Sequence, residues 1–175
     1  PSKHLTGKRV LHVETRGKAM LIHFEHGFSI YSHNQLYGVW KLAKPDKLPN
    51  TKRSLRLALH TADQSAILYS ASDIGVYETP RLAEHPFLAK LGPDILNPQL
   101  QREDLATRLT SKRFRNRALS SLYLDQHFIA GIGNYLRTEI LFAAGLHPDV
   151  KPKDLTDDQI HNLAEQTIVI SLRAY

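Results

Sequence analysis

The sequence predicts an α+β protein of two domains, an antiparallel β-sandwich followed by an all-helical domain. The spacing of apolar residues supports this, because short alternating runs extend to about Glu78 and helical spacing dominates after the middle of the chain. A stretch rich in proline and glycine, residues 91–98, separates the two patterns and is typical of a linker. We therefore expect domains at residues 1–90 and 99–175, joined by residues 91–98.

Six short runs in the first part favour strands, since they alternate apolar and polar residues or are briefly all apolar. They are residues 9–14, 19–24, 28–31, 39–42, 54–61 and 66–70. His26 and Gly27 supply a hairpin turn between the second and third runs. Short strands separated by polar turns indicate an antiparallel sandwich or barrel.

Helical spacing in the second part predicts four helices. They are residues 101–109, 119–124 and 134–144, with a fourth that starts near residue 156 and runs toward 172. Gly145 and then Pro148 end the third helix, and Thr156 with Gln159 forms a capping box for the fourth. The two central helices and the turn between them form a helix–two-turn–helix (H2TH).

The amino-acid composition limits the classes of molecule that the chain is expected to bind. The chain has 175 residues, a formal net charge of +6 and no cysteine. The basic charge favours a polyanionic partner, and the lack of cysteine excludes disulfides and cysteine-ligated zinc within these residues. No apolar run is long enough to span a membrane, so we expect a cytoplasmic protein with no membrane partner.

The turn before the third helix is the most informative segment. Gly131 and Gly133 precede Asn134, where the helix pattern begins. A helix N-terminus presents unpaired N–H groups and a positive dipole end, which suit an anion such as phosphate. Asn134 is either a plain N-cap in a tight interhelical turn or an amide donor to phosphate.

Several separated motifs, in a consistent order, resemble the Fpg/Nei family of DNA glycosylases. They lie at residues 14–18, 85–88, 92–94, 125–135, 137–141 and 144–148. Within the family, residues 32–40 resemble the endonuclease VIII branch rather than the formamidopyrimidine branch. The resemblance covers nearly the whole chain and implies the two-domain fold predicted above.

The resemblance implies a bifunctional base-excision-repair enzyme. Such an enzyme removes oxidised pyrimidines and then cleaves the strand at the abasic site by β,δ-elimination. The implied route uses an N-terminal proline amine that attacks the sugar C1′ and forms a Schiff base, with no nucleotide cofactor. The implied partner is double-stranded DNA that carries an oxidised base or an abasic site, bound by a monomer at the bacterial nucleoid.

Two features of the family are not among these residues. The family opens with Pro-Glu-Gly-Pro-Glu, whereas Pro1 begins a stretch, residues 1–7, that resembles an internal part of the family. The four-cysteine zinc finger of the family has no counterpart in a chain without cysteine. We therefore expect a fragment without the first helix and the last domain, with no cofactor of its own and no catalytic activity alone.

The strongest candidate for DNA probing is the run Gln35, Leu36 and Tyr37, between two predicted strands. An enzyme that extrudes a base must fill the gap it leaves, and the resemblance assigns this task to these residues. Leucine can wedge between base steps, tyrosine can stack, and glutamine can hydrogen-bond an orphaned base. The alternative is an ordinary loop with Leu36 and Tyr37 in a core.

Lys18 is the expected catalytic residue, because the matching lysine of the family serves strand cleavage and phosphate contact. Desolvation can lower the pKa of such an amine toward neutrality, although a solvated surface lysine is the alternative. The other expected DNA contacts are Lys90, Arg115, Gly133 and Asn134. Lys90 stands where the resemblance expects an arginine, so it keeps the charge without the bidentate fork.

Arg115 lies in a basic stretch, residues 111–117, that can follow a phosphate track or form a solvated face. Among the ten histidines no His-x-x-x-His pair occurs, and His23 and His26 flank a predicted hairpin turn, so we assign no metal site. The main rival function is a non-catalytic nucleic-acid-binding H2TH module. A weaker rival is a protein-interaction fragment whose basic charge is incidental.

Overall fold

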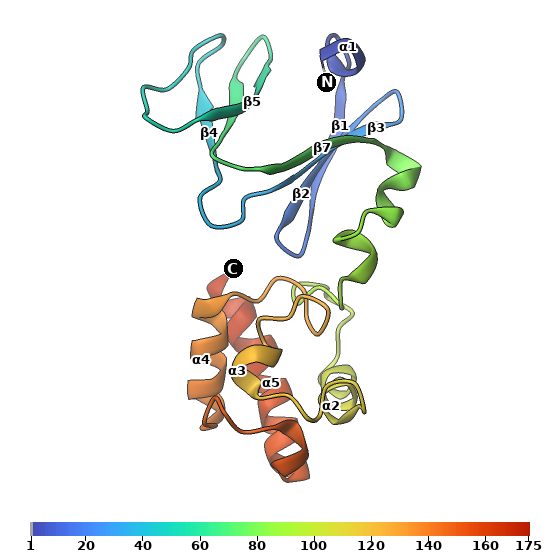
Figure 1. Ribbon diagram of the computed structural model, residues 1–175, viewed down its shortest axis with the longest axis vertical. Coiled ribbons are helices and arrows are strands. Elements are labelled where there is room, and N and C mark those ends of the chain that lie inside the picture. The colour runs from blue at the N-terminus through green and yellow to red at the C-terminus, as the bar shows by residue number, and fades with distance from the viewer. Residues whose placement is uncertain (1) are drawn as a thin grey trace. The chain divides into compact units, whose positions relative to one another are not determined.

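The computed structural model describes residues 2–175, and the chain divides into two compact units after Glu84. The first unit contains the strands and the second contains the long helices (Figure 1). The expected linker, residues 91–98, lies within the second unit. Pro1, which is not expected to correspond to the N-terminal proline of the family, lies outside the described residues.

The first unit holds two antiparallel sheets. The larger sheet has the order β1-β2-β3-β7, and the smaller has the order β4-β6-β5. The larger sheet consists of β1 (Val10–Arg16), β2 (Ala19–Phe24), β3 (Phe28–His33) and β7 (Asp73–Glu78). The smaller consists of β4 (Val39–Ala43), β5 (Leu55–His60) and β6 (Ser65–Tyr69).

Apolar side chains from both sheets form one core. Ile22 and Ile30 of the larger sheet pack in a cluster with Trp40, Leu57 and Leu59 of the smaller one. Because successive residues of a strand point to opposite faces, each sheet turns one face to this core, and the other face of the larger sheet carries Leu21 and Tyr31, which are also buried. The two sheets therefore form the antiparallel sandwich that the sequence predicts.

The six expected strands are present, with ends that differ by a few residues. The structure adds a seventh strand, β7, whose Asp73, Gly75 and Glu78 are residue types disfavoured in strands. It also adds a short helix α1 (Ser2–Leu5) and the 3-10 helices η1 (Thr79–Glu84) and η2 (Leu88–Lys90). Strand β7 forms because it pairs with β3, which is distant in sequence.

The second unit is helical, as expected. It contains α2 (Arg102–Thr110), α3 (Leu119–Leu122), α4 (Asn134–Ala144), the 3-10 helix η3 (Pro152–Asp154) and α5 (Asp157–Ala174). Gly145 ends α4 at φ 67°, and the capping box of Thr156 and Gln159 starts α5. Helix α3 ends two residues before the expected end, residue 124.

One apolar cluster links the helices of this unit, and Leu105, Leu109, Leu119, Ile140 and Leu163 are nearly inaccessible within it. Each such side chain contributes about 1.5–3 kcal/mol when it leaves water. The cluster includes Phe128, Ile129 and Ile132 of the interhelical turn, so the turn is anchored in the core. Across residues 2–175, no helix is both long and apolar enough to cross a membrane.

Candidate nucleic-acid interface

Two of the predicted site elements meet at one end of the four-stranded sheet. The antiparallel register pairs Ala19 of β2 with His33 of β3, and His33 with Asp73 of β7. The β1–β2 turn with Lys18 and the loop that leaves β3 at residue 34 therefore lie at the same end. Tyr31 also contributes here, because its hydroxyl donates a 2.9 Å hydrogen bond to Asp73.

The loop at residues 34–38 is closed by its own backbone. The N–H of Gly38 donates a 2.7 Å hydrogen bond to the carbonyl oxygen of Asn34, and a Cβ on Gly38 would lie 2.5 Å from that oxygen. Gln35 adopts a left-handed φ of 51°, which costs about 1 kcal/mol for a residue other than glycine. Two contacts offset this cost. The backbone N–H of Gln35 donates to Nδ1 of His33 at 2.9 Å, and its Oε1 accepts from Ser72 Oγ at 2.8 Å.

The tip of this loop holds two large apolar side chains in solvent. Leu36 is 80% exposed and Tyr37 is 69% exposed. The guanidinium of Arg53 donates a 2.6 Å hydrogen bond to the carbonyl oxygen of Tyr37 and so fixes the far side of the loop. The alternative that Leu36 and Tyr37 belong to a core is therefore wrong. A braced loop that presents apolar groups to water is suited to insert them into another apolar surface.

Lys18 follows Gly17, which takes a φ of 58° in the β1–β2 turn. Lys18 is exposed, and partial desolvation lowers the pKa of its amine from the ordinary value of a lysine. Burial also lowers the pKa of His33, and the charge of Lys18 lowers it further while Asp73 opposes the change. The positive charge of Lys18 thus acts on the His33 ring beside the loop at residues 34–38.

The interhelical turn of the second unit is locked by one side chain. The Gln126 amide donates from Nε2 to the carbonyl oxygen of Ile132 at 2.9 Å and accepts at Oε1 from the N–H of Gly131 at 2.9 Å. Gly131 has a φ of 101°, and a Cβ there would lie 3.0 Å from the Ile95 side chain. A glycine is therefore required at this point of the turn.

Residues 92–95 run beside the same turn, which explains why the expected linker belongs to the second unit. The N–H of Gly92 donates to Gln126 O at 2.9 Å, and that of Ala130 donates to Pro93 O at 2.9 Å. A Cβ on Gly92 would lie 2.6 Å from a backbone oxygen of the turn, so only glycine allows this approach. These contacts hold the turn that leads into α4.

The start of α4 decides between the two alternatives for Asn134 as a capping residue. Gly133, and not Asn134, is the N-cap residue, and no side chain among the described residues caps this helix. Asn134 is the first residue of the helix and is exposed. Because first-turn N–H groups have no acceptor inside a helix, those at the start of α4 are available to an anion, with the exposed Asn134 amide beside them.

The remaining predicted contacts are exposed cations of the second unit. Lys90 is the last residue of η2, and Arg115 follows the buried Phe114. Arg117 differs, because its guanidinium pairs with the Asp125 carboxylate and so has a structural role. Burial alone would raise the pKa of Asp125, but Arg117 and the N–H of His127 outweigh it and lower the pKa.

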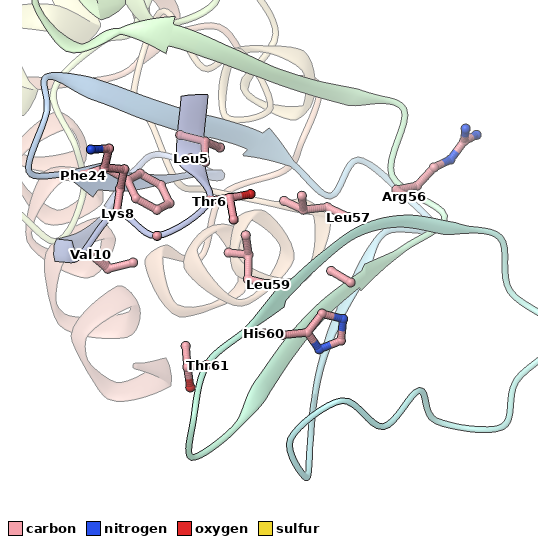
Figure 2. Close-up of a pocket in the computed structure, with 12 residues that line it drawn as sticks. Leu5, Thr6, Lys8, Val10, Phe24, Arg56, Leu57, Leu59, His60 and Thr61 are labelled. Atoms are coloured by element: carbon pink, nitrogen blue, oxygen red, sulfur yellow. The ribbon is translucent and has the colours of Figure 1, made fainter. Parts of the chain in front are cut away.

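The sequence did not identify the residues that brace the loop, Ser72, His33 and Arg53. No local signal marks Ser72 and Arg53, because they reach the loop from other segments of the chain, whereas His33 acts on a residue only two positions away. A separate pocket of the first unit holds none of the predicted site residues. Its lining includes Leu57 and Leu59 of β5, which face Leu5 and Thr6 across it (Figure 2).

Comparisons with known families match both units. The family described as formamidopyrimidine-DNA glycosylase N-terminal domain matches residues 2–72, and its H2TH domain matches residues 91–174. The chain is 50% identical over 171 residues to proteins named Endonuclease 8 from Salmonella typhimurium strains SL1344 and LT2. The matches cover 98% of this chain, and the chain spans about 65% of the length of these relatives.

Comparison with solved structures finds the same family. The chain is similar to Lactococcus lactis formamidopyrimidine-DNA glycosylase bound non-covalently to DNA with an AP site, with a TM-score of 0.84 and 25% identity. That match covers 98% of this chain and 65% of the other. A complex of the same L. lactis protein with DNA that contains an abasic site gives a TM-score of 0.85 and 25% identity, covering 98% and 63% of the two chains.

Proposed function

Because the chain belongs to the Fpg/Nei family, we propose that it forms the DNA-binding and lesion-probing part of a base-excision-repair glycosylase with AP lyase activity. The proposed partner is double-stranded DNA with an oxidised pyrimidine or an abasic site, bound by a monomer. The names of the relatives support this assignment, and the L. lactis relative has been solved with oxidised pyrimidine containing DNA. The observation that carries the proposal is the braced loop with Leu36 and Tyr37 in solvent.

In this proposal the loop enters the base stack where a nucleotide is extruded. Extrusion costs a few kcal/mol of stacking and pairing, and a side chain that fills the gap recovers part of it. Leu36 supplies an apolar wedge, Tyr37 a stacking face, and Gln35 an amide for the base left opposite. The bracing of Gln35 matters because a preordered loop loses less conformational entropy on binding.

The second unit would hold the sugar–phosphate backbone. The open first turn of α4, at Gly133 and Asn134, offers N–H groups and a positive dipole end to a phosphate. Lys90 and Arg115 would add charge contacts, which position the duplex without reading its sequence. Lys90 makes a point-charge contact rather than the two-pronged contact of an arginine.

Lys18 is the residue of this chain that we assign to the chemistry of strand cleavage. Its lowered pKa increases the neutral fraction of the amine, which a proton-accepting role requires. Lysine is also suited to hold a phosphate while protonated. The neighbouring His33 and the loop at residues 34–38 would position the sugar of the abasic site against this amine.

The 175 residues do not contain the family's Pro-Glu-Gly-Pro-Glu, whose proline amine attacks the sugar. We therefore propose that this polypeptide alone binds DNA and does not form the Schiff base. The residues present also do not fit the zinc finger of the family, because no cysteine is available to hold the ion. These 175 residues alone would then behave as the non-catalytic H2TH binding module, whatever the complete protein does.

The proposal is tested by measuring the affinity of the chain for an abasic-site duplex and for an intact duplex of the same sequence. We expect tighter binding to the abasic duplex and a steep loss of affinity with salt for both. Borohydride trapping on the abasic duplex should yield no covalent adduct. Equal affinity for the two duplexes would overturn lesion probing, and an adduct would overturn the claim of inactivity.

A further inference from the structure

Two histidines and a glutamate meet on the face of the larger sheet that does not join the sandwich core. Strand pairing sets His12 of β1 opposite His23 of β2, and alternation along β1 places Glu14 on the same face. One ligand-type atom from each residue lies within 4.8 Å of the others. We propose that His12, Glu14 and His23 bind a divalent transition-metal ion of the zinc class, a role that does not depend on the DNA function proposed above.

The buried half of this site already has the spacing of metal ligands. His23 is 6% exposed, and its Nε2 lies 3.2 Å from Oε1 of Glu14. Ligand atoms about 2.1 Å from a tetrahedral zinc ion lie about 3.4 Å apart, so an ion fits beside both atoms with only a small shift. Two nitrogen ligands and one carboxylate also leave a coordination position for water.

His12 completes the set by a side-chain rotation. Its ring is stacked on that of His23, with centroids 4.2 Å apart and planes at 19°. Stacked rings direct their nitrogens in parallel rather than toward one point, so His12 must turn about its side-chain bonds to reach a shared ion. His12 is exposed, and rotation between staggered conformers is therefore unhindered on the solvent side.

The hydroxyl groups of Ser29 and Thr79 provide a hydrogen-bond partner for Nδ1 of His23 whether or not the ion is bound. Ser29 Oγ lies 2.8 Å from Nδ1 of His23 and 2.7 Å from Oγ1 of Thr79. Without metal, Nε2–H donates to Glu14 while Ser29 donates to Nδ1. With metal on Nε2, Nδ1–H donates to Ser29, which then donates to Thr79. Such an outer partner for the second ring nitrogen is a regular feature of metal-binding histidines.

Arg16 competes with the metal ion for the carboxylate of Glu14. Its Nε lies 3.4 Å from the same Glu14 oxygen, so a metal must compete with a guanidinium that is partly in solvent. The donor set selects the class of ion, because imidazole nitrogens suit zinc and its neighbours whereas calcium and magnesium prefer oxygen ligands. Bound metal would join the exposed edge strand β1 to the buried strand β2, since the three ligands span both.

The test is calorimetric titration of the chelator-treated chain with ZnCl2, together with the visible absorption of bound Co²⁺. We expect one Zn²⁺ per chain. The exposed or half-buried ligands are changed first, and His12→Ala and Glu14→Gln should each weaken binding more than about 100-fold, beyond the range of outer-sphere changes. Ser29→Ala should cost about 10-fold, and Arg16→Ala should strengthen binding.

His161→Ala is the matched control, because His161 is an exposed histidine on α5 in the second unit. The affinity of the His161→Ala variant for Zn²⁺ should equal that of the unchanged chain. Circular dichroism of each variant confirms that the fold is kept. The proposal is overturned if the unchanged chain binds no Zn²⁺, or if the folded His12→Ala and Glu14→Gln variants bind it as well as the control does.

Discussion

Ser72 Oγ donates a 2.8 Å hydrogen bond to Oε1 of Gln35 and so ties the loop after β3 to the residue before β7. This contact joins segments that are distant in the chain and holds a residue whose φ of 51° is otherwise unfavourable. The exposed tip at Leu36 and Tyr37 therefore depends on the pairing of β3 with β7. We therefore expect substitutions at residues that do not contact DNA to alter how this loop recognises damaged DNA.

Ser72→Ala should reduce the preference of the chain for abasic DNA without unfolding it. An intramolecular hydrogen bond is worth about 0.5–1.5 kcal/mol, so the ratio of the two affinities should fall by about 2- to 12-fold. Ser121→Ala is the control, because Ser121 is also exposed and its hydroxyl donates to a carbonyl in the second unit. A Ser72→Ala ratio equal to that of this control would argue against a role for the bracing contact.

Asn134→Ala should weaken binding to abasic and intact duplexes by the same factor. Asn134 is exposed at the start of α4 and makes no cap bond, so stability should change by less than about 0.5 kcal/mol. Thr156→Ala is the control for a loss of stability. Thr156 caps α5 by accepting a hydrogen bond from the N–H of Gln159, and the loss of this cap costs about 1 kcal/mol of stability. A loss confined to damaged DNA would mean that Asn134 does not act on phosphate.

Lys90→Ala should lower the salt dependence of DNA binding. Each phosphate neutralised contributes about 0.9 to the slope of log affinity against log salt, so the slope should fall by about that amount. Lys47→Ala provides the comparison, because Lys47 is exposed in the β4–β5 loop and belongs to no predicted contact. An unchanged slope for Lys90→Ala would place this residue among solvated surface charges.

Asp125 should make the stability of the second unit sensitive to acid. Its folded-state pKa is lowered, because Arg117 and the His127 N–H outweigh the opposing effect of burial. The folded state then binds fewer protons than the unfolded state, so this contribution is present above the ordinary aspartate pKa and is lost as the pH falls through the lowered one. Asp125→Asn should cost about 1.5 kcal/mol at neutral pH.

Denaturant unfolding of both proteins between about pH 7 and pH 2 measures this effect. The difference in free energy of unfolding between the unchanged chain and Asp125→Asn should shrink as the pH falls. A difference that stays constant with pH would show that the Arg117 pair does not contribute through the charge of Asp125.

Much of the fold followed from local patterns, and the failures have a common cause. Helix α4 has the predicted bounds, 134–144, because apolar spacing and Gly145 define it locally. Strand β7 was missed because Asp73 and Gly75 weaken its strand signal, and it is stabilised by pairing with β3 and by packing of Ile74 and Val76 against the core. The alternative in which Asn134 is the N-cap is wrong, because Gly133 occupies that position although asparagine is the residue type preferred there.

The site divides in the same way. The tip residues and Lys18 are predicted from the resemblance and stay predictions, although the exposure of Leu36 excludes the core alternative. Ser72 and Arg53 could not be identified as bracing partners of the loop, because they lie in other segments of the chain. His12 and His23 likewise come together only through strand register, which no His-x-x-x-His spacing in the sequence indicates.

The central claim is that Leu36 fills the space left by an extruded nucleotide. The most direct test is the affinity ratio between abasic and intact duplexes for the unchanged chain and for Leu36→Ala. Because Leu36 is 80% exposed, its loss should leave stability unchanged within about 0.5 kcal/mol. We predict that the ratio falls toward one while the affinity for intact duplex stays the same. A Leu36→Ala chain that keeps its full preference for abasic DNA would contradict the account.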